Sequence, residues 1–308
     1  MDRLDAMTVL LAVVEQGSLS AASRHLRSPL ATVSRKVSDL EAHLNAQLLQ
    51  RSNRKITLTE AGRSYVEAAR EILDRVEEAE RTAAGEYSAP KGELTMTAPI
   101  VFGRLHVLPV VVDFLKAYPD INLQLMLGDR LSNLVEDHID VALRIGNLPD
   151  SNLIATRLGA IRRTVYASPD YLLRHALPRH PGDLAAHDCV TFEGMASALS
   201  WTFTEGKRDL TVPVHSRLAV NTAEAAVDAA VAGLGITRVL SYQAARAEMA
   251  GLLVPLLQDF EPPPAPVHLV YPAQGLVPLK LRALLDFATP RLRATLNKSQ
   301  ASLPSSAL

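Results

Sequence analysis

The sequence has a single cysteine, Cys189, among 308 residues. One cysteine cannot close an internal disulfide, which excludes a disulfide-stabilised secreted scaffold and indicates a reducing cytoplasm. Long apolar runs are also missing, since the longest early one, Val9 to Val14, is too short to span a bilayer and lacks the flanks of a signal peptide. Neither charge sign dominates, because 32 Lys and Arg face 33 Asp and Glu. The whole-chain charge therefore gives no hint of a polyanionic partner, and any such hint must be local.

The composition that is present, 48% hydrophobic and 21% charged, is that of an ordinary globular protein. A length of 308 residues exceeds the roughly 250–300 at which single cores stop growing, and predicts two or more domains. Residues 24–63 hold eight Lys or Arg and three acids, net +5, whereas residues 66–90 hold three Arg and seven acids, net −4. A basic head is thus followed by an acidic stretch, although charge alone favours a merely solvated basic face.

Helical periodicity predicts three short helices in the head. The first buries apolar residues at steps of three and four: Leu4, Met7, Leu11 and Val14. Ser18 is a good N-cap for the second helix, and Ser28 for the third, which has Pro29 at its first position. The third helix buries its own stripe: Val33, Val37, Leu40 and Leu44. This is the arrangement of a helix-turn-helix, and a generic three-helix bundle is the alternative.

The other face of the third helix carries short hydroxyls and long cations, which suit phosphate oxygens and base edges in a major groove. The expected DNA contacts from the helices are Ser18, Leu30, Thr32, Ser34, Arg35 and Lys36. Leu30, near the helix N-terminus, is suited to a thymine methyl.

A basic turn, Arg51 to Lys55, follows this helix and precedes Ile56 and Leu58, which alternate with threonines as in a half-buried strand. A cationic hairpin after a recognition helix is a wing, which contacts the neighbouring backbone or minor groove. Its expected contacts are Arg51, Asn53 and Arg54.

These motifs together resemble the LysR-type transcriptional regulators. The resemblance rests on residues 17–22, 31–41, 48–51 and 58–62, whose order and spacing match the family, with Leu49 where the family often has phenylalanine. It implies an α/β protein: an all-α winged helix-turn-helix with a linker helix, then a periplasmic-binding-protein-like sensor of two lobes. It also implies a homodimer or homotetramer that reads an inverted repeat in double-stranded DNA and works with RNA polymerase. No catalysis and no cofactor are implied.

The acidic stretch predicts a helix that begins near Glu60, capped by Thr57 or Thr59, and ends near Gly85. Its apolar residues step by four and three, as in a coiled-coil seam: Tyr65, Ala69, Ile72, Val76 and Ala79. We interpret this stripe as a dimer seam, because two half-sites need two recognition helices about one turn apart. Packing of the stripe against its own domain is the alternative.

From Glu93 onward strands and helices alternate, which predicts mostly parallel sheets with helices on their faces. Strands are expected at residues 94–98, 121–127, 141–145, 164–167, 236–240 and 267–271, and helices at 102–118, 131–137, 222–233 and from Pro278. The expected boundaries are a head at 1–59, a linker helix at 60–87, a hinge at 88–92 and an effector-binding domain at 93–297. Its lobe I spans 93–162 and 267–297, lobe II spans 163–266, and 298–308 form a flexible tail.

The resemblance implies that a small-molecule effector binds between the two lobes. Backbone N–H groups between the first strand and helix of this half are suited to an anion, but Ile100 and Val101 replace the hydroxyl that family members often carry there. That departure favours a more apolar effector, or none. The expected contacts are Ala98, Pro99, Ile100, Val101, Phe102, Arg144, Gly146, Asn221 and Thr222. For Arg144 a structural ion pair is an equal alternative.

Motifs for catalysis are weak. His187, Asp188 and Cys189 are adjacent in an extended segment and alternate faces, so they cannot form a triad. The histidines lack metal-ligand spacing, and residues 233–236 lack the third glycine of a dinucleotide fingerprint. Two alternatives to an effector-controlled regulator stay open: an enzyme in the two-lobe half with the head as a dimer adaptor, and a scaffold that binds no ligand. Trp201 is interpreted as core packing, with a place in the lining of the cleft as the alternative.

Overall fold

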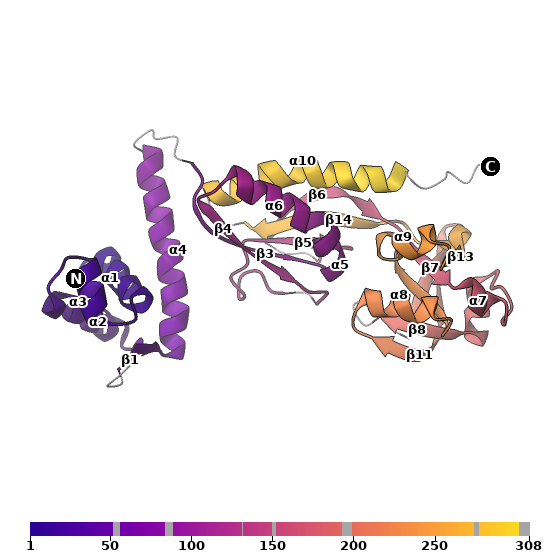
Figure 1. Cartoon of the computed structure of the whole chain (residues 1–308), viewed down its shortest axis with the longest axis horizontal. Helices are drawn as coiled ribbons and strands as arrows, with labels where there is room; N and C mark the ends of the chain where they lie inside the picture. Colours follow the sequence, from indigo (N-terminus) through magenta and orange to yellow (C-terminus); the bar gives the residue numbers. More distant parts are fainter. Residues whose placement is uncertain are drawn as a thin grey trace. The chain divides into compact units, whose positions relative to one another are not determined.

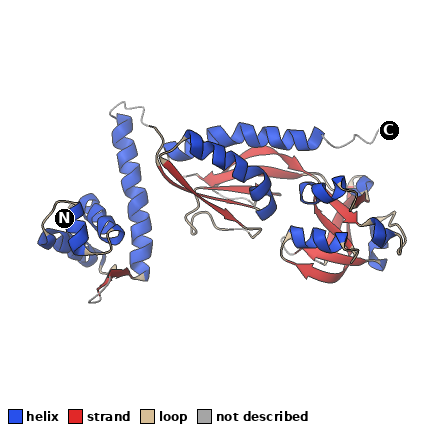
Figure 2. Ribbon diagram, viewed as in Figure 1, coloured by secondary structure: helices blue, strands red, loops and turns tan. Residues whose placement is uncertain are grey.

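The structure is a computed structural model that describes residues 1–51, 56–83, 89–130, 132–149, 152–192, 199–273 and 277–301. The chain divides into two compact units, Met1–Ala89 and Pro90–Leu308. Their elements are drawn in Figure 1, and Figure 2 shows that the first unit is mainly helical while the second mixes helices and strands.

The first unit contains three short helices, a two-stranded antiparallel hairpin and a long helix: α1 (Arg3–Glu15), α2 (Leu19–His25), α3 (Leu30–Leu44), β1 (Leu49–Arg51), β2 (Ile56–Leu58) and α4 (Glu60–Ala83). The predicted helix-turn-helix and the strand of the wing are confirmed. Fully buried side chains of α1 and α3, among them Leu10, Val33 and Leu40, form one core with the start of β1 and of α4. Among the described residues no single helix could cross a bilayer by length and apolarity, and only α1 and α2 together, bent by 116°, pass that test.

The ends of these helices follow from local chemistry, with one difference from expectation. Ser18 Oγ accepts a hydrogen bond from the Ala21 N–H at 3.1 Å, as predicted for an N-cap. The N-cap of α3 is Pro29 rather than Ser28, whose carbonyl accepts a hydrogen bond from Ser23 Oγ at 2.6 Å. The α3 cap thus lies one residue later, because Pro29 keeps an extended ψ of 139° before the helix begins. Leu4 also differs, being 39% exposed beyond the core at the first turn of α1.

The start of α4 lies close to the base of the hairpin. Thr59 Oγ1 accepts a hydrogen bond from the Gly62 N–H at 2.9 Å, so Thr59 is the cap. A Cβ on Gly62 would lie 2.0 Å from the Leu48 carbonyl oxygen. Glycine is therefore the residue that allows α4 to start against the hairpin, which positions the wing beside the linker helix.

The second unit consists of two lobes, each built on a five-stranded sheet. The first lobe contains β3 (Gly92–Ala98), α5 (Ile100–Phe102), the π-helical turn η1 (Gly103–Val107), α6 (Leu108–Ala117), β4 (Ile121–Leu127), β5 (Val141–Ile145), β6 (Leu153–Ile161), β14 (Ala265–Pro272) and α10 (Leu279–Ala301). Its strand order is β4-β3-β5-β14-β6. Because β14 returns between β5 and β6, the chain crosses twice between the lobes, as the resemblance implies. In Figure 1, α6 and α10 lie over the same side of this sheet, and both contribute to its main core.

The second lobe contains β7 (Arg163–Ala167), α7 (Pro169–Leu172), η2 (Pro181–Ala186), β8 (Asp188–Phe192), β9 (Ser200–Glu205), β10 (Arg208–Pro213), β11 (His215–Val220), α8 (Ala223–Val231), β12 (Ile236–Leu240), α9 (Ser241–Met249), β13 (Val254–Leu256) and η3 (Gln258–Phe260). Its sheet order is β11-β8-β12-β7-β13, and β9 and β10 form a separate hairpin. Trp201 on β9 is 3% exposed and packs in the core of this lobe with Phe203.

The predicted strands are confirmed. The expected parallel pairing is wrong for half of the neighbouring strand pairs in the two five-stranded sheets. β14 is antiparallel to both β5 and β6, and β7 is antiparallel to both β12 and β13. β7 and β14 each follow a crossing of the chain from one lobe to the other. Each therefore enters its sheet from the opposite end to the neighbouring strands and runs antiparallel to them.

The helix predicted over residues 131–137 is also wrong, because residues 132–137 contain turns but no helix. Asn133 Oδ1 accepts a hydrogen bond from the Val135 N–H at 3.2 Å, and Asp137 Oδ2 accepts one from the Asn133 N–H at 3.0 Å. Such side-chain bonds compete with the helical pattern of the backbone. Leu134 of this segment is buried, but the apolar spacing did not indicate a helix correctly.

Candidate nucleic-acid interface and effector site

The outer face of α3 presents the side chains that the sequence assigns to DNA. Leu30 is 47% exposed and Arg35 is exposed, whereas Val33 and Val37 on the opposite face are fully buried. Thr32 and Ser34 are half-buried at the edge of the same surface. Because the buried side of α3 packs in the core, its other side faces outward. That side carries the Leu30 side chain, the Thr32 and Ser34 hydroxyls and the Arg35 guanidinium.

Two of the predicted contacts are already engaged within the head. Lys36 Nζ lies 2.6 Å from Asp5 Oδ2 on α1, with the two side chains 30% and 46% exposed. Ser18 Oγ accepts the cap hydrogen bond of α2. Lys36 is thus held over α1 and Ser18 is a helix cap, which leaves Arg35 as the outward cation of the pair on α3.

The wing is fastened to α3 by a residue that sequence reasoning counted only as a charge. Glu41 Oε1 accepts hydrogen bonds from the N–H groups of Leu48 and Leu49 at 2.9 and 3.0 Å. Asn45, in the left-handed region at φ 49°, reverses the chain so that these two N–H groups return to the helix. A helix-ending Asn a few residues after an acid is the signal that could have found this contact.

Of the predicted wing contacts, Arg51 is the last residue of β1, and Asn53 and Arg54 lie outside the described residues. Thr59 Oγ1 donates a hydrogen bond to the Gln47 carbonyl at 2.6 Å, which closes the base of the hairpin. The base of the hairpin therefore lies beside α3 and the start of α4.

The five residues of the expected dimer seam divide into two groups. Ala69 is 1% exposed and half-buried Tyr65 packs against the core of its own head. Ile72 is 41% exposed, Val76 is half-buried and Ala79 is exposed. The first turns of α4 therefore use the stripe for packing within the chain, and the later turns present it outward.

In the sensor half, a carboxylate of the chain itself occupies the turn whose backbone N–H groups are suited to an anion. The Ile100 N–H donates a hydrogen bond to Asp129 Oδ1 at 3.2 Å. Asp129 Oδ2 is buried without a hydrogen-bond partner among the described residues. Burial raises the pKa of Asp129, and the nearby Glu224 carboxylate raises it further, against the lowering effect of the Ile100 bond. An effector anion would have to displace Asp129 to reach this N–H.

Residues from the two lobes meet around this turn. Val101 is 3% exposed within a core cluster of the second lobe, and the Phe102 ring meets Tyr242 of α9 edge-on at 5.4 Å. Arg104 Nη2 contacts Glu224 Oε1 of α8 at 2.8 Å. Burial raises the pKa of Tyr242, as do the Asp129 and Glu224 carboxylates to a smaller extent.

Of the remaining residues predicted to contact the effector here, one is buried, two cap helices and one is exposed. Ala98 is buried and Pro99 is the N-cap of α5. Thr222 Oγ1 caps α8 by accepting a hydrogen bond from the Ala225 N–H at 3.3 Å, and Asn221 beside it is exposed. The structure thus brings residues 98–102 to the junction of the lobes, mainly through buried apolar contacts, and offers Asn221 as the exposed polar group.

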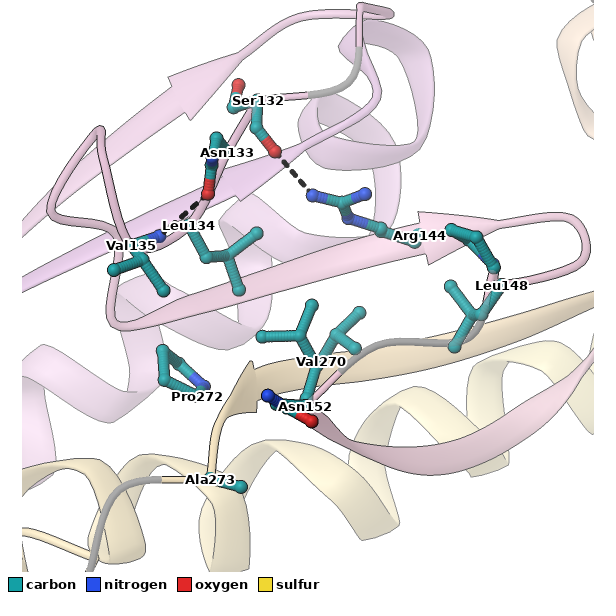
Figure 3. A pocket seen from close by; sticks show the side chains of 12 residues that line it. Ser132, Asn133, Leu134, Val135, Arg144, Leu148, Asn152, Val270, Pro272 and Ala273 are labelled. Carbon is teal, nitrogen blue, oxygen red and sulfur yellow. Dashed lines mark hydrogen bonds between the residues drawn. The ribbon is translucent and has the colours of Figure 1, made fainter.

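Arg144 and Gly146 follow a different pattern. Arg144 Nη2 donates a hydrogen bond to the Ser132 carbonyl at 2.5 Å, which is a contact with a backbone oxygen rather than an acid. Arg144 lines a cavity of about 520 Å³ whose lining residues all belong to the first lobe. Figure 3 shows Arg144 among these residues. Gly146 has a φ of 117°, in the region that favours glycine, and turns the chain after β5.

Cys189 and His187, which lie in the segment with the weak catalytic motif, have structural roles. Cys189 is fully buried, and burial raises the pKa of its thiol to about 12, with a further rise from the Asp188 carboxylate. The buried His187 ring lies 3.1 Å from the Tyr171 hydroxyl. Across the described ranges, no group of three or more His, Cys, Asp or Glu is arranged to hold a metal ion.

Known proteins share both halves of the chain. Residues 4–63 match the family model of the bacterial regulatory helix-turn-helix protein, lysR family, and residues 88–293 match the LysR substrate binding domain. An HTH-type transcriptional regulator of Xanthomonas campestris pv. campestris is 34% identical over 98% of this chain and 89% of its own length.

Two solved structures are similar to this chain over nearly its full length. CrgA of Neisseria meningitidis, described as a LysR-type transcriptional regulator, has a TM-score of 0.59 and 31% identity, covering 94% of this chain and 98% of its own. The Vibrio cholerae virulence activator AphB has a TM-score of 0.58 and 29% identity, covering 92% of this chain and 98% of its own.

Proposed function

The chain belongs to the LysR family of transcriptional regulators, and from this premise we propose which of its residues read DNA and how the sensor half controls them. It is a DNA-binding regulator with an effector-binding domain, and its relatives are regulators rather than enzymes. The proposed functional boundaries are 1–59 for the head, 60–87 for the linker helix, 88–92 for the hinge and 93–297 for the sensor. We propose that it acts in the cytoplasm.

The proposed DNA surface is the outer face of α3 together with the wing. Arg35 and Leu30 support it best, because both are exposed while the opposite face of α3 is buried. Arg35 is proposed to read a base edge or hold a phosphate, Leu30 to meet a thymine methyl, and Thr32 and Ser34 to bind phosphate oxygens at the edge of the groove. Arg51, Asn53 and Arg54 are proposed to contact the neighbouring backbone from the wing.

The proposed oligomer is a dimer, or a tetramer built from dimers, that presents two heads to an inverted repeat. The outward part of the seam, Ile72, Val76 and Ala79, supports pairing of α4 with a second copy, because these residues are not buried in the head. RNA polymerase is the further proposed partner.

The proposed effector site lies at the junction of the two lobes, between the turn after β3 and the start of α8. Its support is the contact of Arg104 with Glu224 and of Phe102 with Tyr242, since a ligand there would change how the lobes meet. An effector controls the protein only if it binds two arrangements with unequal affinity. Because Asp129 already occupies the Ile100 N–H, an apolar or hydrogen-bond-donating effector fits better than an anion at this position. Small-angle scattering of the full chain with a bound effector should differ from that without it, and identical profiles would contradict this switch.

The observation that carries the proposal is the exposed Arg35 on a helix whose other face is the core of the head. Footprinting of the purified chain on the chromosome of its source organism tests it. Protection of intergenic inverted repeats is the expected result, and the adjacent genes would indicate the effector. Absence of any sequence preference at low ionic strength, with each candidate metabolite tried, would contradict the proposal.

A further inference from the structure

The first-lobe sheet has a face that α6 and α10 do not cover. Side chains on β5 alternate, so that Leu143 joins the core under those helices while Ala142 and Arg144 face the other side. A cavity of about 520 Å³ lies there, on the side of Ala142 and Val270. Ligand pockets in proteins span roughly 300–1,000 Å³. The size therefore suits a small organic molecule.

Eight of the twelve residues that line this cavity are apolar, and the other four are polar or charged. Leu134 and Val270 are 2% and 1% exposed and belong to the small core of this face, and Leu148 and Leu153 border it. Figure 3 shows Leu134, Leu148 and Val270 around the same space. Residues 132–137 form turns instead of a packed helix, so this face is only partly closed. An apolar body that entered would bury surface on several sides.

One charged group shares the cavity with these walls. Arg144 is half-buried, so its guanidinium is partly stripped of water, and this burial lowers its pKa. One of its N–H groups is used on the Ser132 carbonyl, whereas a guanidinium carries five. In the part of the chain that the structure describes, no Asp or Glu forms an ion pair with it. A desolvated cation in this position gains from an anion brought to it.

We propose that this cavity binds an amphipathic organic anion, with its carboxylate on Arg144 and its apolar body along Leu148, Leu153 and Val270. The site is separate from the proposed effector site, because no residue of the second lobe lines it. It does not depend on DNA binding either, so the two proposals can fail independently.

Titration calorimetry on the full chain without DNA tests this with two probes of equal length and opposite charge, octanoate and octylammonium. Octanoate should bind saturably, one per chain, and octylammonium at least about tenfold more weakly. Arg144→Gln should weaken octanoate at least about tenfold, whereas Arg144→Lys, which keeps the charge, should stay within a few-fold of the natural chain. Arg282→Gln is the matched control, because Arg282 is an exposed arginine on α10, which covers the opposite face.

A second variant keeps the test open if Arg144→Gln does not fold. Leu153→Trp fills the cavity without touching the charge and should abolish octanoate binding. Absence of saturable octanoate binding would overturn the proposal, as would equal binding of the two probes or no effect of either variant. Weakening by Asn221→Ala, at the junction of the lobes, with no effect of Arg144→Gln would also overturn it.

Discussion

The carboxylate of Asp129 accepts a hydrogen bond from the backbone N–H of Ile100 at 3.2 Å, in the turn whose N–H groups the sequence indicates as suited to an anion. Its second oxygen is buried without a partner among the described residues. An internal carboxylate thus caps the turn after β3, at the cost of one unpaired acceptor. We therefore expect the stability of this region to depend on the protonation state of Asp129.

We expect Asp129→Asn to remove part of the pH dependence of stability. Burial, and then Glu224, raise the pKa of Asp129 in the folded chain above its ordinary value of 3.8. Between that value and the folded pKa the folded state therefore binds more protons than the unfolded state, so the free energy of unfolding falls as pH rises through this window. The asparagine can still accept the Ile100 hydrogen bond but cannot ionise.

The measurement is urea unfolding by circular dichroism from acid to neutral pH. The variant should gain stability relative to the natural chain as pH rises through that window, and the gain should level off above it. Asp209→Asn, at an exposed position on β10, is the control and should follow the natural chain throughout. Parallel profiles for Asp129→Asn and the natural chain would contradict the role given to Asp129.

The fold could be predicted from the sequence where local chemistry determines it. Ser18 as a cap and Val33, Val37 and Leu40 as a buried stripe depend only on residues within a few positions of one another. Six strands of the sensor half followed from short apolar runs between turn residues, whereas β6, β8, β9, β10, β11 and β13 were not predicted. The helix prediction for residues 132–137 was wrong because polar side chains of this segment accept hydrogen bonds from its own backbone. Such bonds compete with helical hydrogen bonds, and apolar periodicity does not reveal them.

The sequence predicted which surface of the head faces outward, but it did not predict the contacts that individual side chains make there. Which face of α3 is outward follows from its stripe, but that Lys36 pairs with Asp5 depends on how two helices cross. The same holds for Asp129 and Ile100, which are 29 positions apart. A polar residue far along the chain can take a site that local reasoning leaves for a ligand, because only packing brings the two together.

Arg35→Ala should weaken specific DNA binding by roughly 1–3 kcal/mol if Arg35 reads a guanine edge, and by less if it holds a phosphate. Gel-shift titrations across a salt series separate the two roles, because a phosphate contact is lost equally on scrambled DNA and lowers the salt slope by about one. Arg282→Ala removes the same charge from the other unit and should have no effect. Unchanged affinity of Arg35→Ala would exclude Arg35 from the interface.

Glu41→Ala should loosen the wing. Its carboxylate accepts the N–H groups of Leu48 and Leu49, and hydrogen bonds to a charged group contribute about 1.5–3 kcal/mol. Thermal unfolding of the head should therefore begin at lower temperature, and DNA affinity should fall for every sequence, because the wing positions rather than reads. Glu41→Gln keeps one acceptor oxygen and should fall between the natural chain and Glu41→Ala. Equal behaviour of all three proteins would contradict this anchoring role.

Ile72→Asp should dissociate the dimer by placing a charge in the outward part of the α4 seam. Ala69→Asp differs in its expected result, because Ala69 is 1% exposed and packs within its own chain, so an acid there should unfold the head. Light scattering reports mass, and circular dichroism reports folding. A folded Ile72→Asp protein with unchanged mass would reject this seam.

Asp5→Asn should strengthen DNA binding while barely changing stability. The ion pair of Lys36 with Asp5 is partly exposed, and pairs of this kind contribute roughly 0–1 kcal/mol to folding. Releasing Lys36 returns a cation to the basic face of the head, so affinity for duplexes of any sequence should rise. The plot of log affinity against log salt should steepen by about one unit if the freed ammonium meets a phosphate. Combining Asp5→Asn with Lys36→Gln is the control, because it removes the cation and should cancel the gain. A gain that survives in the double variant would show that Asp5 acts through the loss of its own negative charge near DNA rather than through Lys36.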